Sequence, residues 1–327
     1  MRGPPDRLKL IAMENIDGLH HVTAITGDAP GNLDFYTRVL GMRLVKKTVN
    51  QDDVSAYHLF YADAKGSPGT DVTFFDWPQT HPQRPGAGSI APVALRVAGA
   101  SALDYWVSRF DAEGVSHGAV AERNGRPILG FLDPEGQRLE LVGDGGAPGG
   151  EPWAASEVPP EHQVKGLHGV TLTSLNPQST ADLLVGGMGF RLAGKRELPE
   201  GGEEHFLEVG PGGPGTEVIL SVPTQVGRAL QGKGGVHHVA FRVPDAEAQE
   251  AWRSRIEEIG LRPTPVIDRF YFKSIYFREP GGTLFEIATD GPGFAADEPV
   301  EHLGEGLALP PFLEPDRERI VAGLVPL

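Results

Sequence analysis

The chain has 327 residues, enough for about two domains, and its shares of hydrophobic (39%) and charged (22%) residues are ordinary for a globular protein. A net charge of −15 argues against nucleic acid or an anionic membrane as a partner, because both bind clustered Lys and Arg. The absence of cysteine excludes disulfides, thiolate metal sites and cysteine nucleophiles. Any metal must therefore be held by nitrogen and oxygen ligands.

Two further features of the sequence bear on location and fold class. The N-terminal residues lack an apolar core long enough for a signal peptide, and no apolar run approaches the length of a membrane span. We therefore expect a cytoplasmic protein. The 44 Gly and 29 Pro residues fall between short apolar stretches, which predicts many strands joined by tight turns rather than disorder.

One apolar stretch with a His pair occurs near both ends of the chain, as LHHV at residues 19–22 and as VHHV at residues 236–239. Other stretches repeat at a nearly constant spacing. Residues 41–44 (GMRL) return as GFRL 148 positions later, and residues 68–72 (PGTDV) return as PGTEV 146 positions later. The second half of the chain therefore repeats the first.

Each half divides again, so that the chain consists of four modules with the pattern βαβββ and belongs to the α+β class. Each module opens with an alternating strand, continues into an amphipathic helix and closes with strands joined by Gly/Pro turns. The opening strands are predicted at residues 19–25, 90–97, 167–172 and 236–243. The helices are predicted near residues 31–40, 102–113, 180–187 and 246–259. Two modules side by side would enclose a cleft lined by strand residues, a rigid place for a site.

Matching positions of the four modules carry different residues. At the second His of the opening strand, the modules have, in order, His21, Pro92, Gly169 and His238. Near the end of the closing strands they have Thr73, Glu140, Ile219 and Glu286. Pairing the first module with the fourth gives two His and one Glu, whereas the second and third supply a single Glu. We therefore hypothesise one metal site, formed by His21, His238 and Glu286, although the residues alone do not choose between the members of each His pair.

Two neutral imidazoles and one carboxylate on one face leave several coordination positions open. This is the facial triad of non-haem Fe(II) oxygenases, in which substrate and O₂ bind at the vacant positions. Such a set also tolerates Mn(II) and could hold Zn(II), so the ligand types leave the metal open. The cleft between the second and third modules is expected to be structural, with Glu140 hydrogen-bonded inside it.

These features resemble the vicinal oxygen chelate superfamily and, more narrowly, the ring-cleaving (chloro)hydroquinone 1,2-dioxygenases. The resemblance runs along nearly the whole chain and is carried by residues 18–23, 57–63, 66–70, 160–162, 166–169, 236–238, 280–286, 297–299 and 303–305. It implies two glyoxalase-like barrels built from the four modules. Common extradiol catechol dioxygenases place their site in the second half, where Gly169 here lacks the required His.

The resemblance also implies a ligand set and an activity. The family holds Fe(II) with the second His of each pair and the late Glu, which match His21, His238 and Glu286. The implied reaction is the opening of a hydroquinone-type aromatic ring with O₂. The expected partners are therefore a small para-diol and O₂, with no nucleic acid and no membrane. Mn(II) is the alternative metal, and a homo-oligomer is left open.

Pocket roles are implied at the positions of Thr23, His237, Arg269 and Tyr276. His237 is the first candidate for moving protons, since an ordinary His titrates near neutral pH. Neighbours on a regular strand point to opposite faces, however, so His237 needs a bulge to reach the site of its neighbour. The same objection applies to His20, which ranks lower.

The other three candidates have distinct expected roles. Tyr276 is a plausible phenolic proton donor, and Arg269 is suited to an anionic oxygen or a second ring substituent. Thr23 shares the face of His21 by the period of two along a strand, so it is expected to line the pocket. The remaining histidines lack a complete partner set and are expected to be structural or at the surface; they are His58, His81, His117, His162, His168, His205 and His302.

Two other functions compete with ring cleavage. A metal-dependent isomerase or lyase of glyoxalase type would need a second carboxylate where Thr73 stands. A non-catalytic protein that binds a small aromatic molecule would have no use for two converging His and a Glu. Metal content separates the binding protein from the two enzymes, and O₂ uptake separates the enzymes from each other.

The expected domain organisation follows the repeat. We predict an N-terminal tail (1–16), a first vicinal-oxygen-chelate domain (17–146), a linker (147–165), a second such domain (166–292) and a C-terminal tail (293–327). The run from residue 314 to residue 327 is expected to form a short amphipathic helix that packs on the body or on a partner.

Overall fold

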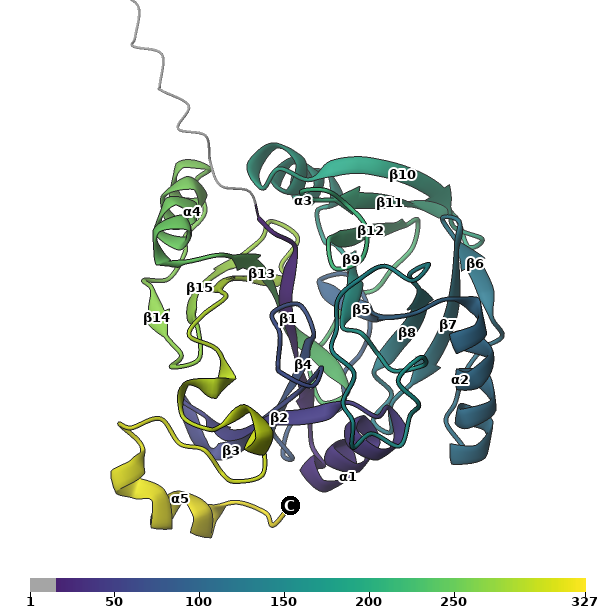
Figure 1. Cartoon of the computed structure of the whole chain (residues 1–327). Helices are drawn as coiled ribbons and strands as arrows, with labels where there is room; N and C mark the ends of the chain where they lie inside the picture. Colours follow the sequence, from purple (N-terminus) through teal and green to yellow (C-terminus); the bar gives the residue numbers. More distant parts are fainter. Residues whose placement is uncertain (1–15) are drawn as a thin grey trace, which may run out of the picture.

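The computed structural model describes residues 16–327, so the predicted N-terminal tail lies outside the described residues except for Ile16. Two eight-stranded sheets make up most of the described fold, with helices at their outer sides (Figure 1). The α+β class and the fourfold βαβββ pattern predicted from the sequence are confirmed.

The first sheet combines the first module with the fourth. Its strand order is β14-β15-β16-β13-β1-β4-β3-β2. The bounds of its strands are β1 Leu19–Thr26, β2 Arg43–Asn50, β3 Asp53–Ala62, β4 Asp71–Asp76, β13 Gly235–Val243, β14 Ile267–Asp268, β15 Lys273–Arg278 and β16 Leu284–Thr289. The antiparallel pair β1–β13 joins the two modules at the centre of the sheet.

The second sheet combines the second module with the third in the order β10-β11-β12-β9-β5-β8-β7-β6. The bounds of its strands are β5 Ser89–Val97, β6 Ala121–Arg123, β7 Arg126–Leu132, β8 Arg138–Gly143, β9 Leu167–Thr173, β10 Arg191–Glu197, β11 Gly202–Glu208 and β12 Glu217–Pro223. Each sheet thus takes one module from each half of the chain, as the positional pairing of His21 with His238 requires.

The helices lie where the periodicity predicts them. Their bounds are α1 Ala29–Asp34, α2 Ala100–Glu113, α3 Pro177–Asp182, α4 Ala246–Glu258 and α5 Arg317–Gly323, and α1 and α3 each continue into one π-helical turn. In α4, the Asp245 side chain caps the first turn by accepting from the backbone N–H groups of Glu247 and Ala248. Trp252 and Ile256 then face the core at helical spacing.

One hydrophobic core joins the two sheets, with Val22 and Val239 from the first and Val93 and Leu172 from the second. These residues belong to the central strands, which are covered on both faces. Burial extends along the whole of β1, since all eight of its residues are buried, the two His and two Thr included.

Two bulges interrupt the pairing of β1 with β13. Leu19 and His21 pair with Phe241 and Ala240, which leaves His20 as an extra residue. The register shifts again after the Thr23–His238 pair, which leaves out His237. The corresponding pair β5–β9 carries shifts at matching places, so the bulges belong to the repeat and not to the His pairs.

The C-terminal segment packs on the edge of the first sheet, beside β2 and β3 (Figure 1). The predicted helix forms as α5, and its Ile320 is buried against Val49 and Leu309. Before α5, the same segment contributes Asp297 and Glu298. These two carboxylates pair with the fully buried Lys46 of β2, Asp297 at 2.7 Å. Within residues 16–327, no helix is long and apolar enough to cross a membrane.

Candidate metal centre

Three side chains from three neighbouring strands converge in the first sheet. His21 comes from β1, His238 from β13 and Glu286 from β16, and one ligand atom of each lies within 4.8 Å of the others. Glu286 Oε2 is 2.8 Å from His238 Nε2 and 3.3 Å from His21 Nε2, and the two Nε2 atoms are 3.3 Å apart. All three residues are buried.

Strand pairing explains this convergence of residues far apart in sequence. Thr23 pairs with His238 across β1–β13, and Ala240 pairs with Glu286 across β13–β16. These registers bring the inward faces of β1, β13 and β16 together. On the far side of the carboxylate, the Ser274 hydroxyl donates to Glu286 Oε1 at 2.5 Å. One carboxylate oxygen is therefore held, and the other points at the histidines.

A hydrogen-bond chain behind His21 fixes which ring nitrogen faces Glu286. The carbonyl oxygen of Thr289 can only accept, so His20 donates to it from Nε2 at 3.1 Å. The Nδ1 of His20 is then an acceptor, and it lies 2.9 Å from Nδ1 of His21. His21 therefore carries its proton on Nδ1 and presents the lone pair of Nε2 to the site. This is the second partner that metal-binding His residues commonly have.

His238 likewise has a second ring behind it, on the opposite side. Its Nδ1 lies 2.8 Å from Nδ1 of His237. Each pair of rings meets edge to face, with centroids 5.1 Å apart, which is the contact that the two bulges allow. His20 and His237 thus lie behind the two candidate ligands, and neither lines the cavity in front of them.

Electrostatics suits His20 and His237 to this orienting position rather than to proton uptake. Burial and the neighbouring imidazole lower the pKa of His20 and of His237 to about 3, so both stay neutral near pH 7. Burial opposes ionisation of Glu286, but the adjacent His21 and His238 hold the pKa of its carboxyl well below the usual range. The centre therefore places an ionised carboxylate beside two imidazoles.

The donor set fits a divalent cation. Glu286 Oε2 has no hydrogen-bond partner within residues 16–327, although it lies 2.8 Å from His238 Nε2. Two imidazole nitrogens and one carboxylate oxygen gathered this closely favour a positive charge between them. This N/N/O set is suited to Fe(II), Mn(II) or Zn(II) and leaves coordination positions open toward the cavity.

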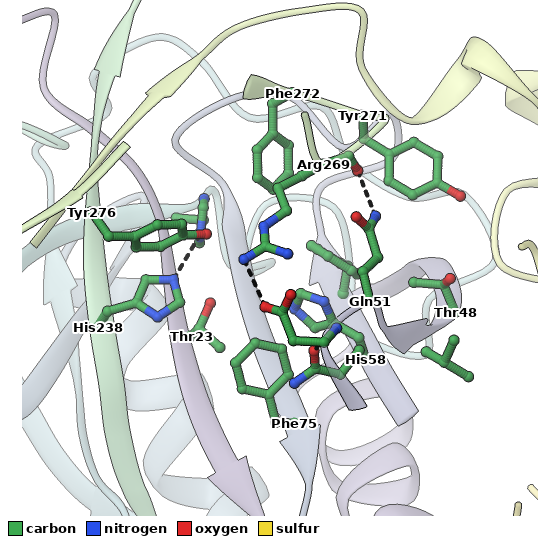
Figure 2. A pocket seen from close by; sticks show the side chains of 15 residues that line it. Thr23, Thr48, Gln51, His58, Phe75, His238, Arg269, Tyr271, Phe272 and Tyr276 are labelled. Atoms are coloured by element: carbon green, nitrogen blue, oxygen red, sulfur yellow. Dashed lines mark hydrogen bonds and ion pairs between the residues drawn. The ribbon is translucent and has the colours of Figure 1, made fainter. Parts of the chain in front are cut away.

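A cavity of about 460 Å³, a volume that includes its open mouth, is lined by His21 and His238 of this group. Figure 2 shows His238, Tyr276, Arg269 and His58 around it. Of the five residues for which pocket or acid–base roles are predicted, Thr23, Arg269 and Tyr276 line this cavity, whereas His20 and His237 do not. Aromatic side chains form much of the remaining wall, contributed by Phe60, Phe75, Tyr271 and Phe272.

Arg269 connects the two ends of the sheet across the cavity. Its guanidinium donates to Asp52 Oδ2 at 2.8 Å, and its backbone carbonyl accepts from the Gln51 side chain at 2.9 Å. Gln51 and Asp52 form the turn between β2 and β3. The guanidinium also lies over the ring of Tyr276, 5.6 Å from the centroid. Burial raises the pKa of Tyr276 above its usual value, so this phenol keeps its proton at neutral pH.

The corresponding position in the second sheet is closed by an ion pair. Glu140, which matches Glu286, accepts from both terminal nitrogens of Arg123, at 2.9 Å in one of the two contacts. Gly169 and Pro92 stand where the histidines would be. Glu140 is therefore hydrogen-bonded in its own cleft, as predicted, and no second group of metal-ligand type forms within residues 16–327.

Among the cavity residues that sequence reasoning missed, His58 and Asp52 carry the polar contacts of most interest. His58 was grouped with the structural histidines, yet it lines the cavity next to Phe60 and Phe75. No sequence pattern places Asp52 at the cavity, because its partner Arg269 is over two hundred residues away. The alternation of His58 with Phe60 on a strand that pairs with β4 was the signal that could have placed His58 on an inward face.

Comparison with known proteins identifies the family. A model of the Glyoxalase/Bleomycin resistance protein/Dioxygenase superfamily matches residues 18–141 and 166–287. The chain is 46% identical over 313 residues to the "Putative ring-cleaving dioxygenase MhqA" of Bacillus subtilis, covering 95% of this chain and 99% of that protein. It is 34% identical over 318 residues to the "Chlorohydroquinone/hydroquinone 1,2-dioxygenase" of Sphingobium indicum, covering 94% and 96%.

A solved structure gives the same result. The crystal structure of a "putative dioxygenase" from Bacillus subtilis matches with a TM-score of 0.87 at 40% identity, covering 96% of this chain and 98% of that one. The chain belongs to the Glyoxalase/Bleomycin resistance protein/Dioxygenase superfamily, so the resemblance inferred from the sequence is confirmed. The predicted enzyme class, a ring-cleaving dioxygenase, is confirmed with it.

Proposed function

We propose that this protein is an Fe(II)-dependent dioxygenase that opens hydroquinone-type aromatic rings with O₂, with Mn(II) as the alternative metal. The observation that carries the proposal is the set of three buried lone-pair donors, His21 Nε2, His238 Nε2 and Glu286 Oε2, which face one another at the base of an aromatic-lined cavity. The relative that carries hydroquinone dioxygenase in its name supports the substrate class. A cytoplasmic location is proposed from the sequence.

His21, His238 and Glu286 would hold the metal, and His20 and His237 would keep the two imidazoles in the binding tautomer. A bound Fe(II) would supply a Lewis acid that acidifies a ring hydroxyl and open positions for O₂. Among the competing functions, a glyoxalase-type enzyme is less well supported, because Thr73 makes hydrogen bonds to other residues and offers no carboxylate.

The cavity residues suit a flat, oxygen-bearing ring. Phe75 and Phe272 offer apolar surfaces to a ring. Tyr276 retains its proton at neutral pH and can donate a hydrogen bond to a developing oxyanion. Arg269 supplies a fixed positive charge at the same end of the cavity, where it can hold an anionic oxygen. Thr23 offers a hydroxyl on the β1 side.

Oxygen consumption tests the proposal. Protein loaded anaerobically with Fe(II) is mixed with O₂ and hydroquinone, methylhydroquinone or catechol, and uptake is recorded together with the absorbance of a ring-opened product. Glu286→Gln removes the charge of the carboxylate and should abolish both metal binding and uptake. Glu140→Gln makes the same change at the matching position of the second sheet and should leave both intact.

The outcomes separate the candidate functions. Uptake with para-diols in the wild type and in Glu140→Gln, but not in Glu286→Gln, supports the proposal. Bound metal without uptake for any diol would contradict it and favour the glyoxalase-type reaction. As a check on the cavity, Tyr276→Phe should keep the metal and lose about 100-fold or more in kcat/KM, the size expected for a lost proton donor.

A further inference from the structure

A chain of three side chains borders the cavity on the side formed by the first module. The hydroxyls of Thr23 and Thr73 lie 2.8 Å apart, and Nε2 of His58 lies 3.0 Å from the Thr73 hydroxyl. Thr23 and His58 line the cavity, whereas Thr73 lies behind them. The chain therefore starts and ends at the cavity, with its middle member covered.

The shared hydroxyl of Thr73 couples the two ends. When His58 accepts at Nε2, Thr73 donates to it and accepts from Thr23, so Thr23 presents a lone pair to the cavity and His58 presents an Nδ1–H. When His58 donates from Nε2, every bond reverses: Thr23 offers a proton and His58 a lone pair at Nδ1. Within the described residues, Nδ1 of His58 makes no hydrogen bond that would oppose either state.

The surroundings of His58 allow this exchange without movement or a change in charge. Its ring is held between Phe60 and Phe75, with centroids 3.9 Å and 4.5 Å away, so it cannot turn to a new partner. Burial and the neighbouring His21 and His238 lower the pKa of His58 well below its usual value, so the ring stays neutral in both states.

The second sheet provides an internal comparison. Thr23 pairs with Thr73 across β1–β4, and the matching pair across β9–β12 is Thr171 with Ile219. The position that matches His58 holds Glu204, which pairs with Arg196. The second sheet, which lacks the candidate metal ligands, thus keeps the first threonine but has no counterpart of Thr73 or His58. The chain of three is present only in the sheet that carries the candidate metal centre.

We propose that Thr23, Thr73 and His58 form a proton relay that removes the hydroxyl proton of the bound diol, an inference that rests on the proposed function. The proton leaves the diol oxygen for Thr23, the Thr23 proton moves to Thr73, the Thr73 proton moves to Nε2 of His58, and the Nδ1 proton of His58 leaves to water. The diol oxygen keeps the electron pair of its broken O–H bond. Thr23 is thereby the residue that touches the diol, and Thr73 and His58 act through it.

The first test reads the tautomer of His58 directly. Protein labelled with ¹⁵N-histidine is loaded with Zn(II), which keeps the nuclear resonances sharp, and His58→Gln identifies the signal. Without a diol, the relay predicts a proton on Nδ1. Anaerobic addition of hydroquinone should move it to Nε2 in the wild type but not in Thr73→Val. An unchanged tautomer in the wild type would overturn the relay.

The second test uses turnover. Thr73→Val keeps the shape of the side chain but removes the hydroxyl, and should lower kcat/KM for hydroquinone by about 100-fold or more with the metal content unchanged. Thr73→Ser restores the hydroxyl and should recover most of the activity. Thr171→Val, the matched change in the second sheet, should have no effect.

The outcomes distinguish the relay from the proposed function. O₂ uptake by the wild type that persists undiminished in Thr73→Val would overturn the relay alone. Absence of uptake by the wild type with every diol would overturn the proposed function and the relay with it. Loss of O₂ uptake in Thr73→Val with recovery in Thr73→Ser supports both the relay and the proposed function.

Discussion

Replacing His20 with Ala should weaken metal binding although His20 is no ligand. The His20 ring lies between Nδ1 of His21 and the carbonyl oxygen of Thr289, at 2.9 Å and 3.1 Å. It is this chain that leaves the lone pair of His21 Nε2 facing Glu286. Without it, the imidazole of His21 is free to take the other tautomer, in which Nε2 carries a proton and repels a cation.

The expected loss of metal affinity follows from the role of the hydrogen bond between His20 and His21. Loss of the partner behind a metal-binding His typically lowers metal affinity about 10- to 100-fold, which corresponds to about 1.4–2.7 kcal/mol. His20 is 3% exposed, so its removal also leaves a void and an unsatisfied carbonyl, at about 1–3 kcal/mol of folding free energy for the lost hydrogen bond. The loss of metal affinity must therefore be measured apart from the loss of stability.

His168→Ala is the matched control. His168 occupies the position of His20 in the second sheet and is 1% exposed, but the residue after it is Gly169 and not a candidate ligand. Metal-free proteins are titrated with Mn(II) against a fluorescent chelator, and urea unfolding gives stability. Both variants should be destabilised, and only His20→Ala should lose metal affinity. Wild-type affinity in His20→Ala, or an equal loss in both variants, would refute the reasoning.

Three further predictions concern the cavity, the C-terminal segment and pH. Arg269→Gln should raise KM for a para-diol about 10- to 100-fold in steady-state kinetics, since a charge-assisted hydrogen bond contributes about 1.5–3 kcal/mol; an unchanged KM would exclude substrate contact. Lys46→Met should lower the free energy of unfolding by about 3 kcal/mol in urea, because it leaves the carboxylates of Asp297 and Glu298 without their buried cation; a loss below about 1 kcal/mol would contradict this. Burial raises the pKa of Asp133 from 3.8 to about 6, so the folded state binds the proton more tightly and stability falls as pH rises from about 4 to 6, by up to about 3 kcal/mol. Asp133→Asn should remove that slope in unfolding curves recorded across this range, and an unaltered slope would assign it to another group.

The sequence by itself determined the modules and the residues of the candidate metal centre. Turn residues and apolar alternation are local signals, so the four βαβββ units could be recognised and superimposed by position. Superposition then showed that only the first and fourth modules together carry two His and a Glu. That deduction needed no structure, because a strand position fixes the face on which a side chain lies.

Tertiary structure alone decided how the His pairs work. Regular alternation places His20 and His237 on the face away from their neighbours, but bulges in the β1–β13 pair bring their rings back into contact with the candidate ligands. A bulge depends on the register between strands more than two hundred residues apart, which no local pattern encodes. The acid–base role of His237 stays a prediction, and its position behind His238 also allows an orienting role.

The same reason applies to the residues that complete the cavity. Asp52 meets Arg269, and Lys46 meets Asp297, only because the sheet brings its two edges and the C-terminal segment together around the cavity. His58 joins Thr23 through Thr73 because three adjacent strands are in register. Contacts of this kind depend on the closed packing of strands distant in sequence, so the residue types and their spacing could predict the candidate ligands but not the side chains that surround them.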